Sequence, residues 1–183
     1  MGWKSEHKQQ TKARILSAAG QLFTRLGYER VSIDDVMAAA GLTRGAFYAH
    51  FGSKSELYAE AIVTAAIRAR NLLLEPLSES PSVDAIAARY LSPERARDGD
   101  ARCPLAFLAT DIHQRDDQVR DAYTRVLKGF ARTLAGNTTA VELSPQTLRQ
   151  LVLLVGGLAL ARAVNDPALS QCLLDACRQG VNG

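Results

Sequence analysis

The sequence predicts an all-α fold of about nine helices. Apolar residues recur at intervals of three and four along nearly the whole chain, which is the period of an amphipathic helix. No segment shows the alternation of apolar and polar residues that a half-buried strand needs. Gly and Pro stand mostly where such helices would begin or end. With 183 residues, the chain has room for one or two domains.

Four helices are predicted in the first part of the chain, over residues 9–26, 32–40, 44–50 and 54–74. The first carries its apolar residues on one stripe and stops at Gly27, because glycine adopts the left-handed conformation of a helix C-terminus without steric cost. Gly41 supplies a tight turn after the second helix. The second and third elements are therefore two short helices joined by a glycine turn.

Capping residues indicate where these helices begin. Ser32 stands three residues before Asp35, and Ser53 stands three residues before Glu56, which is the form of a capping box. Thr43 is placed to cap the third helix. Each cap oxygen accepts a hydrogen bond from an N–H group that has no partner inside the helix, which stabilises the helix by about 1 kcal/mol.

Five further helices are predicted over residues 83–91, 104–115, 117–135, 145–164 and 167–179. Pro145 and Pro167 each follow a capping residue and occupy the first helical position, where the missing N–H of proline costs nothing. Pro93, which follows a serine, is a candidate start for a short additional helical piece before a polar loop at residues 97–102. The Pro- and Ser-rich stretch at residues 75–82 is interpreted as a linker between two modules.

Charge is distributed unevenly along the chain. Residues 1–70 hold 10 Lys and Arg against 6 Asp and Glu, whereas residues 71–183 hold 12 against 13. A basic module joined to a nearly neutral one indicates a polyanionic partner for the first and a different partner for the second. A solvated basic tail would give the same pattern, so charge alone does not decide between these interpretations.

The sequence argues against several classes of protein. The longest apolar run, residues 151–161, has 11 residues, whereas a bilayer-spanning helix needs about 20. The basic N-terminus is not followed by the apolar segment of a signal peptide, so the cytoplasm is the expected compartment and no membrane partner is expected. Cys103, Cys172 and Cys177 are too few for a disulfide framework, and no Cys/His spacing typical of metal sites occurs. We therefore expect neither a metal site nor a cofactor.

The segment from residue 29 to residue 58, ERVSIDDVMAAAGLTRGAFYAHFGSKSELY, has the form of a helix-turn-helix. Its apolar residues would pack the two short helices against each other and against the first helix; they are Ile33, Val36, Met37, Ala40, Leu42, Phe47 and Phe51. In such motifs the N-terminal residues of the second helix contact base edges in the major groove of DNA. Arg44 could form a bidentate pair with guanine there, and the small Gly45 and Ala46 would let the backbone approach closely.

The same residues carry a resemblance to a known family. The ILSAAGQLF stretch of the first helix, the Gly27-Tyr28 stop and the segment VSIDDVMAAAGLTRGAFYAHFGSKSELY resemble the DNA-binding domain of the tetracycline-repressor (TetR) family of transcriptional regulators. The resemblance covers residues 10 to 60. The family's spacing of tyrosine, histidine, phenylalanine and lysine is matched by Tyr48, His50, Phe51 and Lys54.

The resemblance implies two domains and a mode of DNA binding. A helix-turn-helix DNA-binding domain would occupy residues 1–53, and an effector-binding and dimerisation domain would occupy residues 54–183, with the helix at residues 54–74 as the connector. The implied partner is a palindromic operator in double-stranded DNA. Phosphate contacts are implied for Ser32, Thr43, Tyr48, His50 and Lys54, and base contacts for Arg44, Gly45 and Ala46.

Three of these residues have a purely structural alternative. Tyr48 would otherwise be a core aromatic, His50 a surface histidine and Lys54 a solvated lysine of the first helical turn. A cation at a helix N-terminus is unfavourable because the helix dipole is positive there. A bound phosphate would remove that conflict at Lys54.

The helix predicted at residues 145–164 is almost wholly apolar. Gly156 and Gly157 each cost a helix interior about 1 kcal/mol relative to alanine, and with neighbouring alanines they form a small-residue surface on which another helix can pack. Together with the helix at residues 167–179, we expect a homodimer built on a four-helix arrangement; the alternative is a core helix of a monomer. Two helix-turn-helix domains related by a twofold axis would bind a palindrome.

A pocket for an unidentified small-molecule effector is expected in the second domain. Apolar surroundings with a few convergent polar groups are typical of such sites. The candidate lining residues are Phe107, Thr110, Asp111 and Gln114, which lie near one helix face, joined by Tyr90 and Tyr123. Ordinary core or surface positions are the alternative for each of them.

Cys103 is a candidate redox sensor. It stands next to Arg102 and just before Pro104, at the predicted start of a helix. Both the helix N-terminus and the arginine favour the thiolate, so a lowered pKa is expected for Cys103. The alternative is a small buried residue without such chemistry.

These features predict a dimeric, sequence-specific transcriptional regulator, a repressor that a small molecule or, alternatively, a redox signal releases from its operator; activation is the other mode. An enzyme is not expected, because Cys103 and His113 are about 15 Å apart along a helix and no phosphate-binding glycine loop or nucleophile elbow occurs. A helical interaction module that has lost operator binding is a further alternative. The intact residues from Thr43 to Lys54 argue against it.

Overall fold

The computed structural model describes residues 2–75, 77, 81–96, 102–136 and 143–181, with side chains from residue 6 onward. Within these residues the protein has ten helices and no strand, so the predicted all-α fold is confirmed. The helices are α1 (Gly2–Leu26), α2 (Ile33–Ala39), α3 (Arg44–Phe47), α4 (Lys54–Leu74), α5 (Val83–Tyr90), α6 (Pro93–Ala96), α7 (Pro104–Ile112), α8 (Asp117–Leu134), α9 (Pro145–Ala163) and α10 (Pro167–Gly180).

The observed boundaries differ from the predicted ones in a few places. The additional short piece at Pro93 is α6, which makes ten helices instead of about nine, and α1 begins seven residues earlier than predicted. α3 ends at Phe47 because the chain tightens into a turn, in which the N–H of His50 donates to the carbonyl of Phe47. α7 ends at Ile112 for the same reason, since the N–H of Arg115 donates to the carbonyl of Ile112. The predicted polar loop lies outside the described residues up to residue 101.

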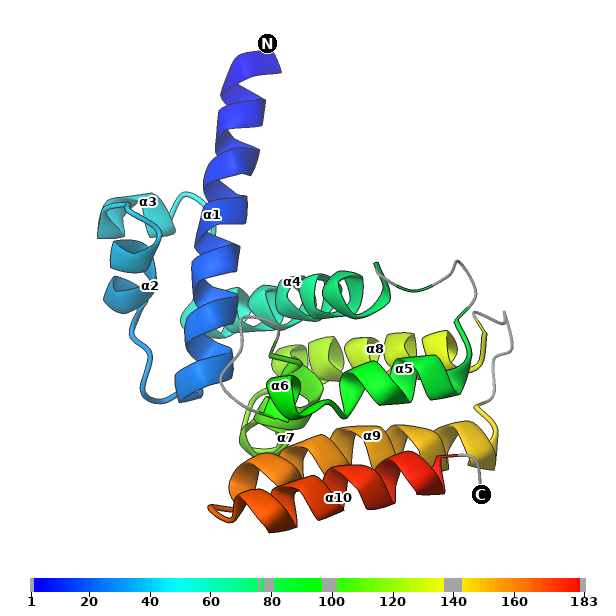
Figure 1. Ribbon diagram of the computed structural model, residues 1–183. Coiled ribbons are helices and arrows are strands. Elements are labelled where there is room, and N and C mark those ends of the chain that lie inside the picture. Colours follow the sequence, from blue (N-terminus) through cyan, green and yellow to red (C-terminus); the bar gives the residue numbers. More distant parts are fainter. Residues whose placement is uncertain (1, 76, 78–80, 97–101, 137–142, 182–183) are drawn as a thin grey trace.

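Helices α1 to α3 lie together at one side of the molecule, and α4 runs crosswise to α1 (Figure 1). α4 packs both on α1 and along α8, so it joins the two parts of the chain. α9 and α10 form an antiparallel pair at the edge of the molecule farthest from the N-terminus (Figure 1). The N-terminal half of α1 extends beyond the other helices (Figure 1).

Local sequence signals explain how the first helices are joined. Gly27 and Gly41 have φ angles of +79° and +66°, which glycine adopts without strain. The Oγ of Ser32 accepts a hydrogen bond from the N–H of Asp35 at 3.0 Å, and the Asp35 carboxylate accepts one from the N–H of Ser32 at 2.8 Å. This reciprocal pair confirms the predicted capping box. Ser53 also caps α4, where its Oγ accepts the N–H of Glu56, but the Glu56 carboxylate accepts the N–H of Gly52 and not that of Ser53, so the predicted reciprocal box is only half formed.

Two apolar clusters form the core. The first joins α1, α2, α3 and the first half of α4 to α7 and the start of α8, with Phe23, Phe47 and Tyr58 almost fully buried. The second joins the end of α4 to α5 and to α7 through α10. Leu77, inside the predicted linker, packs against this second cluster. Residues 76 and 78–80 of the predicted linker lie outside the described residues, but Leu77 and the packing of α5 on α4 place both helices in one helical body, so two modules are not separated here as predicted.

Gly157 allows α10 to approach α9 closely. A Cβ atom added at residue 157 would lie 2.5 Å from the Sγ of Cys177 and 3.0 Å from its Cβ. A Cβ added at Gly156 would meet nothing within 4 Å. Of the two glycines predicted to face another helix, Gly157 is therefore used inside the chain, whereas Gly156 faces open space.

We expect Gly157→Ala to lower the free energy of unfolding by about 1–3 kcal/mol, because the added methyl group overpacks α9 against α10. Urea denaturation followed by circular dichroism measures this change. Cys177→Ala removes the sulfur that the methyl group would meet, so the double variant should be more stable than Gly157→Ala alone. A Gly157→Ala variant as stable as the unchanged chain would contradict the close approach.

Candidate nucleic-acid interface and ligand cavity

The second helix of the helix-turn-helix, α3, is held in place from its inner side. Phe47 is fully buried and stacks on Phe51, with ring centroids 5.7 Å apart. Arg14 of α1 donates to the carbonyl of Ala40 at 2.7 Å, which ties the turn before α3 to α1. The position of α3 is therefore determined by α1 and by the core.

The outer side of α3 carries exposed polar and aromatic groups. Tyr48 is 63% exposed, and its ring packs edge-on against Phe47 with centroids 5.1 Å apart. Thr43 occupies the N-cap position, but its exposed hydroxyl makes no cap hydrogen bond, so the predicted side-chain cap is wrong. A Cβ added at Gly45 would meet nothing within 4 Å. This surface is open to a large partner.

Arg44 is exposed and already has a partner. Its Nη1 lies 2.6 Å from the Oδ2 of Asp34 on α2. The Tyr48 hydroxyl and then the Asp34 carboxylate raise the pKa of Arg44 above its ordinary value. Because both members of the ion pair are exposed, solvent screens their attraction and the pair exchanges readily. A contact from Arg44 to any other partner would require this ion pair to open.

His50 and Lys54, two of the predicted phosphate contacts, are partly buried. Burial, and then the charges of Lys8 and Lys12, lower the pKa of His50 and so favour its neutral form. The Nδ1 of His50 has no hydrogen-bond partner within the described residues. The Nζ of Lys54 lies 4.0 Å from the centroid of the Tyr28 ring. This cation–π contact stabilises a lysine at the start of α4 without a phosphate.

The other two predicted DNA contacts, Ser32 and Ala46, belong to α2 and α3, the two helices of the helix-turn-helix. Ser32 is exposed at the N-cap of α2, where its hydroxyl also donates to Asp35 at 2.6 Å. Ala46 is half-buried on α3. Ser32 is therefore accessible to a partner and Ala46 partly so, but the Ser32 hydroxyl already has an acceptor within the chain.

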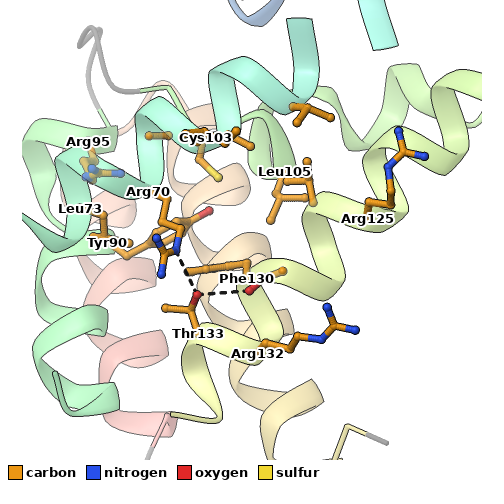
Figure 2. Close-up of a pocket in the computed structure, with 16 residues that line it drawn as sticks. Arg70, Leu73, Tyr90, Arg95, Cys103, Leu105, Arg125, Phe130, Arg132 and Thr133 are labelled. Atoms are coloured by element: carbon orange, nitrogen blue, oxygen red, sulfur yellow. Dashed lines mark hydrogen bonds between the residues drawn. The ribbon is translucent and has the colours of Figure 1, made fainter. Parts of the chain in front are cut away.

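A cavity of about 470 Å³ lies among helices α4 to α8 (Figure 2). Its walls are mostly apolar and include Leu73, Leu105 and Phe130. Four arginines also line it, namely Arg70, Arg95, Arg125 and Arg132. A cavity of this size, with apolar walls and a few polar groups, is typical of a small-molecule site.

Tyr90 brings a polar group into this cavity. Its side chain is 1% exposed, and its ring stacks on Phe130 with centroids 5.2 Å apart. The hydroxyl has no hydrogen-bond partner within the described residues, although the Cys103 thiol lies near it. A buried hydroxyl without a partner costs about 1–3 kcal/mol, so this group is available to a molecule in the cavity.

Comparisons with known proteins agree with this arrangement. The family model of bacterial regulatory proteins of the tetR family matches residues 15–61, which extend from α1 into α4. An uncharacterized HTH-type transcriptional regulator of Bacillus subtilis (strain 168), YfiR, is 30% identical over 147 residues, which cover 76% of this chain and 71% of YfiR. The chain belongs to the tetR family. The family predicted from the sequence motifs is thus confirmed.

Two further relatives show how the likeness of this TetR-family chain is distributed. The HTH-type transcriptional regulator TtgR of Pseudomonas putida is 44% identical over 52 residues, 28% of this chain and 25% of TtgR. A solved structure of a TetR transcriptional regulator from Chloroflexus aurantiacus has a TM-score of 0.75 at 22% identity, and the match covers 97% of this chain and 96% of that one. The fold is therefore shared along the whole chain, whereas the higher sequence identity is confined to a short segment.

No helix in the described part of this TetR-family chain is long and apolar enough to cross a membrane. Likewise, no group of three or more metal-binding side chains gathers within the described residues.

The cavity in the TetR-family structure includes one of the six predicted pocket residues, Tyr90. The Phe107 ring packs instead beneath the Arg162 guanidinium, 4.0 Å from the ring centroid. Tyr123 donates its hydroxyl hydrogen to the carbonyl of Leu105 at 2.7 Å. Both aromatics therefore stabilise α7 and its neighbours from outside the cavity.

The remaining predicted pocket residues, on or just after α7, also lie outside the cavity. Thr110 and Gln114 are exposed. Asp111 accepts a hydrogen bond from the hydroxyl of Tyr58 at 2.5 Å. The helical period grouped these residues correctly, but it does not say which neighbour their face meets. That face meets Tyr58 of α4 through Asp111, Arg162 of α9 through Phe107, and solvent at Thr110 and Gln114.

The cavity residues that the sequence interpretation missed had one local signal. Arg125, Gly129 and Arg132 are spaced by four and three residues along α8, which places them on one helix face. A Cβ added at Gly129 would meet nothing within 4 Å, so the glycine leaves open space between the two arginines. A glycine flanked by cations on one face was therefore visible in the sequence.

The predicted lowering of the Cys103 pKa is wrong. Cys103 occupies the N-cap of α7 as expected, but it is 7% exposed. Burial raises the pKa of the thiol, and this effect exceeds the opposing effects of Tyr90 and of the backbone N–H groups of α7. His113 lies at the other end of α7, as expected. Cys103 in this TetR-family chain is thus a buried thiol.

The DNA-binding helices contact the rest of the chain at a cluster that we call the domain junction, formed by Tyr28, Glu29, Tyr58, Asp111 and Arg115. The Arg115 side chain, 11% exposed, places its Nη1 2.5 Å from the Oε1 of Glu29. Its guanidinium lies 4.6 Å from the centroid of the Tyr28 ring. Tyr58 is fully buried, and burial and its hydrogen bond to Asp111 raise its pKa, so it remains a donor. The junction thus joins three separate elements.

Arg115→Gln should lower the free energy of unfolding by about 1–2 kcal/mol, because it removes a cation that contacts Glu29 and the Tyr28 ring across the junction. Arg120→Gln is the matched control, since Arg120 is exposed and pairs with Asp117 in the same helix. We expect the control to change stability by less than about 0.5 kcal/mol. Urea denaturation compares the two, and equal effects would argue against a special role for Arg115.

Proposed function

We propose that this chain is a homodimeric, cytoplasmic repressor of transcription that a small molecule releases from a palindromic operator. The observation that carries the proposal is the outer side of α3, where the exposed Tyr48 ring and Thr43 hydroxyl stand on a helix anchored by buried Phe47. Membership of the tetR family supports DNA binding by this part of the chain.

Phosphate contacts are proposed for Ser32, Thr43, Tyr48, His50 and Lys54. Hydroxyl groups and backbone N–H groups at helix N-termini bind phosphates and set the position of the protein on the duplex. Burial lowers the pKa of His50 in the DNA-free chain, so its proposed contribution is a hydrogen bond to a phosphate oxygen. Lys54 would supply the positive charge of this set.

Base contacts are proposed for Arg44, Gly45 and Ala46. Arg44 would exchange its ion pair with Asp34 for a bidentate pair with guanine. The open space around Gly45 supports a close approach of the α3 backbone to the groove. Because Asp34 competes with DNA for Arg44, base recognition here depends on an exchange of partners.

Tyr48→Ala should weaken binding to the DNA upstream of the chain's own gene by about tenfold, because a phosphate contact is lost. Arg44→Gln should instead reduce the preference for this DNA over a scrambled sequence. Arg68→Gln, which removes an exposed arginine of α4, is the control and should change neither quantity. Fluorescence anisotropy at two salt concentrations measures the affinities. Equal binding of the unchanged chain to both DNAs would contradict the proposal.

A homodimer through α9 and α10 is proposed from an exposed apolar face. Leu148, Val152 and Leu160 on α9 are 43%, 68% and 58% exposed, and Leu169 on α10 is 46% exposed. Gly156 adds a small residue with open space around it between Val152 and Leu160. A second copy related by a twofold axis would cover this face with the same residues.

Val152→Glu should convert the dimer into a monomer and weaken operator binding, because a charge would be buried at the centre of the proposed interface. Leu72→Glu is the control, since Leu72 is also exposed but lies on α4. Sedimentation equilibrium gives the mass of each variant. If the unchanged chain sediments as a monomer while it binds its operator, the dimer proposal fails.

Two helices connect the cavity to the domain junction, and we propose that they transmit the signal. α7 begins beside the cavity at Leu105 and carries Asp111 of the junction near its other end. α4 contributes Leu73 to the cavity and Tyr58 to the junction. A ligand that fits one arrangement of these helices better would change DNA affinity through typically 1–3 kcal/mol of coupling. The burial of Cys103 favours a small molecule over a redox signal.

A further inference from the structure

Three polar groups lie at one end of the cavity. The Cys103 thiol lies near the Tyr90 hydroxyl and the Arg95 side chain lies to one side of them (Figure 2), and each of the three groups shifts the pKa of the other two. Tyr90 is 1% exposed, and no hydrogen bond of normal geometry reaches its hydroxyl from the described residues. A buried hydrogen-bond donor is thus directed into the cavity beside a cation.

Arg95 lacks an acidic partner in the described part of the chain. The charged or polar groups that act on it are Cys103, Tyr90 and the cation of Arg89, and burial lowers its pKa. A partly buried guanidinium without a counter-ion is unfavourable, and a bound anion would compensate for it. This end of the cavity therefore favours a negatively charged group.

The other charged residues that line the cavity are also positive, and the walls between its two ends are apolar. Arg125 lies at the end of the cavity opposite Arg95 (Figure 2), and no acidic residue is among the described residues that line the cavity. Between these ends the walls are formed by Leu73, Leu105 and Phe130. Walls of one charge sign attract the opposite charge and repel cations. An apolar molecule with one anionic group fits both features.

We propose that the cavity binds an amphipathic monocarboxylate, with its carboxylate on the Arg95 guanidinium and the Tyr90 hydroxyl and its apolar body along Leu73, Leu105 and Phe130. The effect of this ligand on operator binding rests on the proposed function, in which a small molecule releases the protein from DNA. The binding itself requires no DNA, so it is tested separately. The cavity volume of about 470 Å³ is within the range of sites for small organic molecules.

The test compares three probes of nearly equal shape, 4-phenylbutyrate, 4-phenylbutanol and 4-phenylbutylamine, by isothermal titration calorimetry with the full chain. The carboxylate should bind about 10- to 100-fold more tightly than the alcohol, because hydrogen bonds to charged groups are the stronger ones. The amine should bind more weakly than the alcohol, since the arginines repel it. An alcohol or amine that binds as tightly as the carboxylate overturns the proposal, as does the absence of binding by all three probes.

Two variants test whether the carboxylate contacts Arg95 and Tyr90. Arg95→Gln should reduce carboxylate affinity to that of the alcohol and leave the alcohol unchanged, whereas Arg68→Gln, outside the cavity, should leave both unchanged. Tyr90→Phe should weaken carboxylate binding about 3- to 30-fold. The same change should raise the melting temperature of the ligand-free chain by about 2–4 °C, because it removes an unpartnered buried hydroxyl.

The outcomes separate this inference from the proposed function. If Arg95→Gln does not fold, as judged by circular dichroism, the Tyr90→Phe result decides; unchanged carboxylate affinity in that variant overturns the proposal. Carboxylate binding that depends on Arg95 and Tyr90 supports the proposal even if operator affinity does not change. In that case the coupling between cavity and DNA is rejected, and the ligand class is retained.

Discussion

The buried phenol of Tyr58 joins α4 to α7. Tyr58 is inaccessible to solvent, so its hydroxyl requires an acceptor, and Asp111 provides it. That bond holds the Asp111 side of α7 against α4, together with the buried apolar residues Leu108 and Ile112 of the same helix. At the other end of α7, Leu105 lines the cavity. The cavity and the domain junction therefore lie at the two ends of one helix.

Features that depend on a few neighbouring residues could be predicted from the sequence. The bounds of α4, the capping box of Ser32 with Asp35, and the turns at Gly27 and Gly41 agree with the structure. Capping and left-handed glycine conformations act within one helical turn, so the local sequence contains the information needed. The family could be identified from the helix-turn-helix motif because that motif is also a local stretch of sequence.

Features that depend on which elements meet could not be predicted in this way. The face of α7 was identified, but its direction depends on Tyr58, which is more than 50 residues away in sequence. The partner of Arg44 is Asp34 on another helix, so the arginine could not be recognised as paired. The pKa of Cys103 depends on how much chain covers it, and coverage follows from packing. Local sequence contains none of these three facts.

The absence of a side chain at residue 157 has a consequence at the opposite end of the molecule. Gly157 sets how near α10 lies to α9, and thereby the width of the face, formed by both helices, that would meet a second copy. In a twofold dimer, a wider face would displace and tilt the two subunits relative to each other. The α3 helices lie far from that face (Figure 1), so a small tilt becomes a larger change in their separation. The spacing of half-sites in the proposed operator would then depend on the absence of a side chain at residue 157.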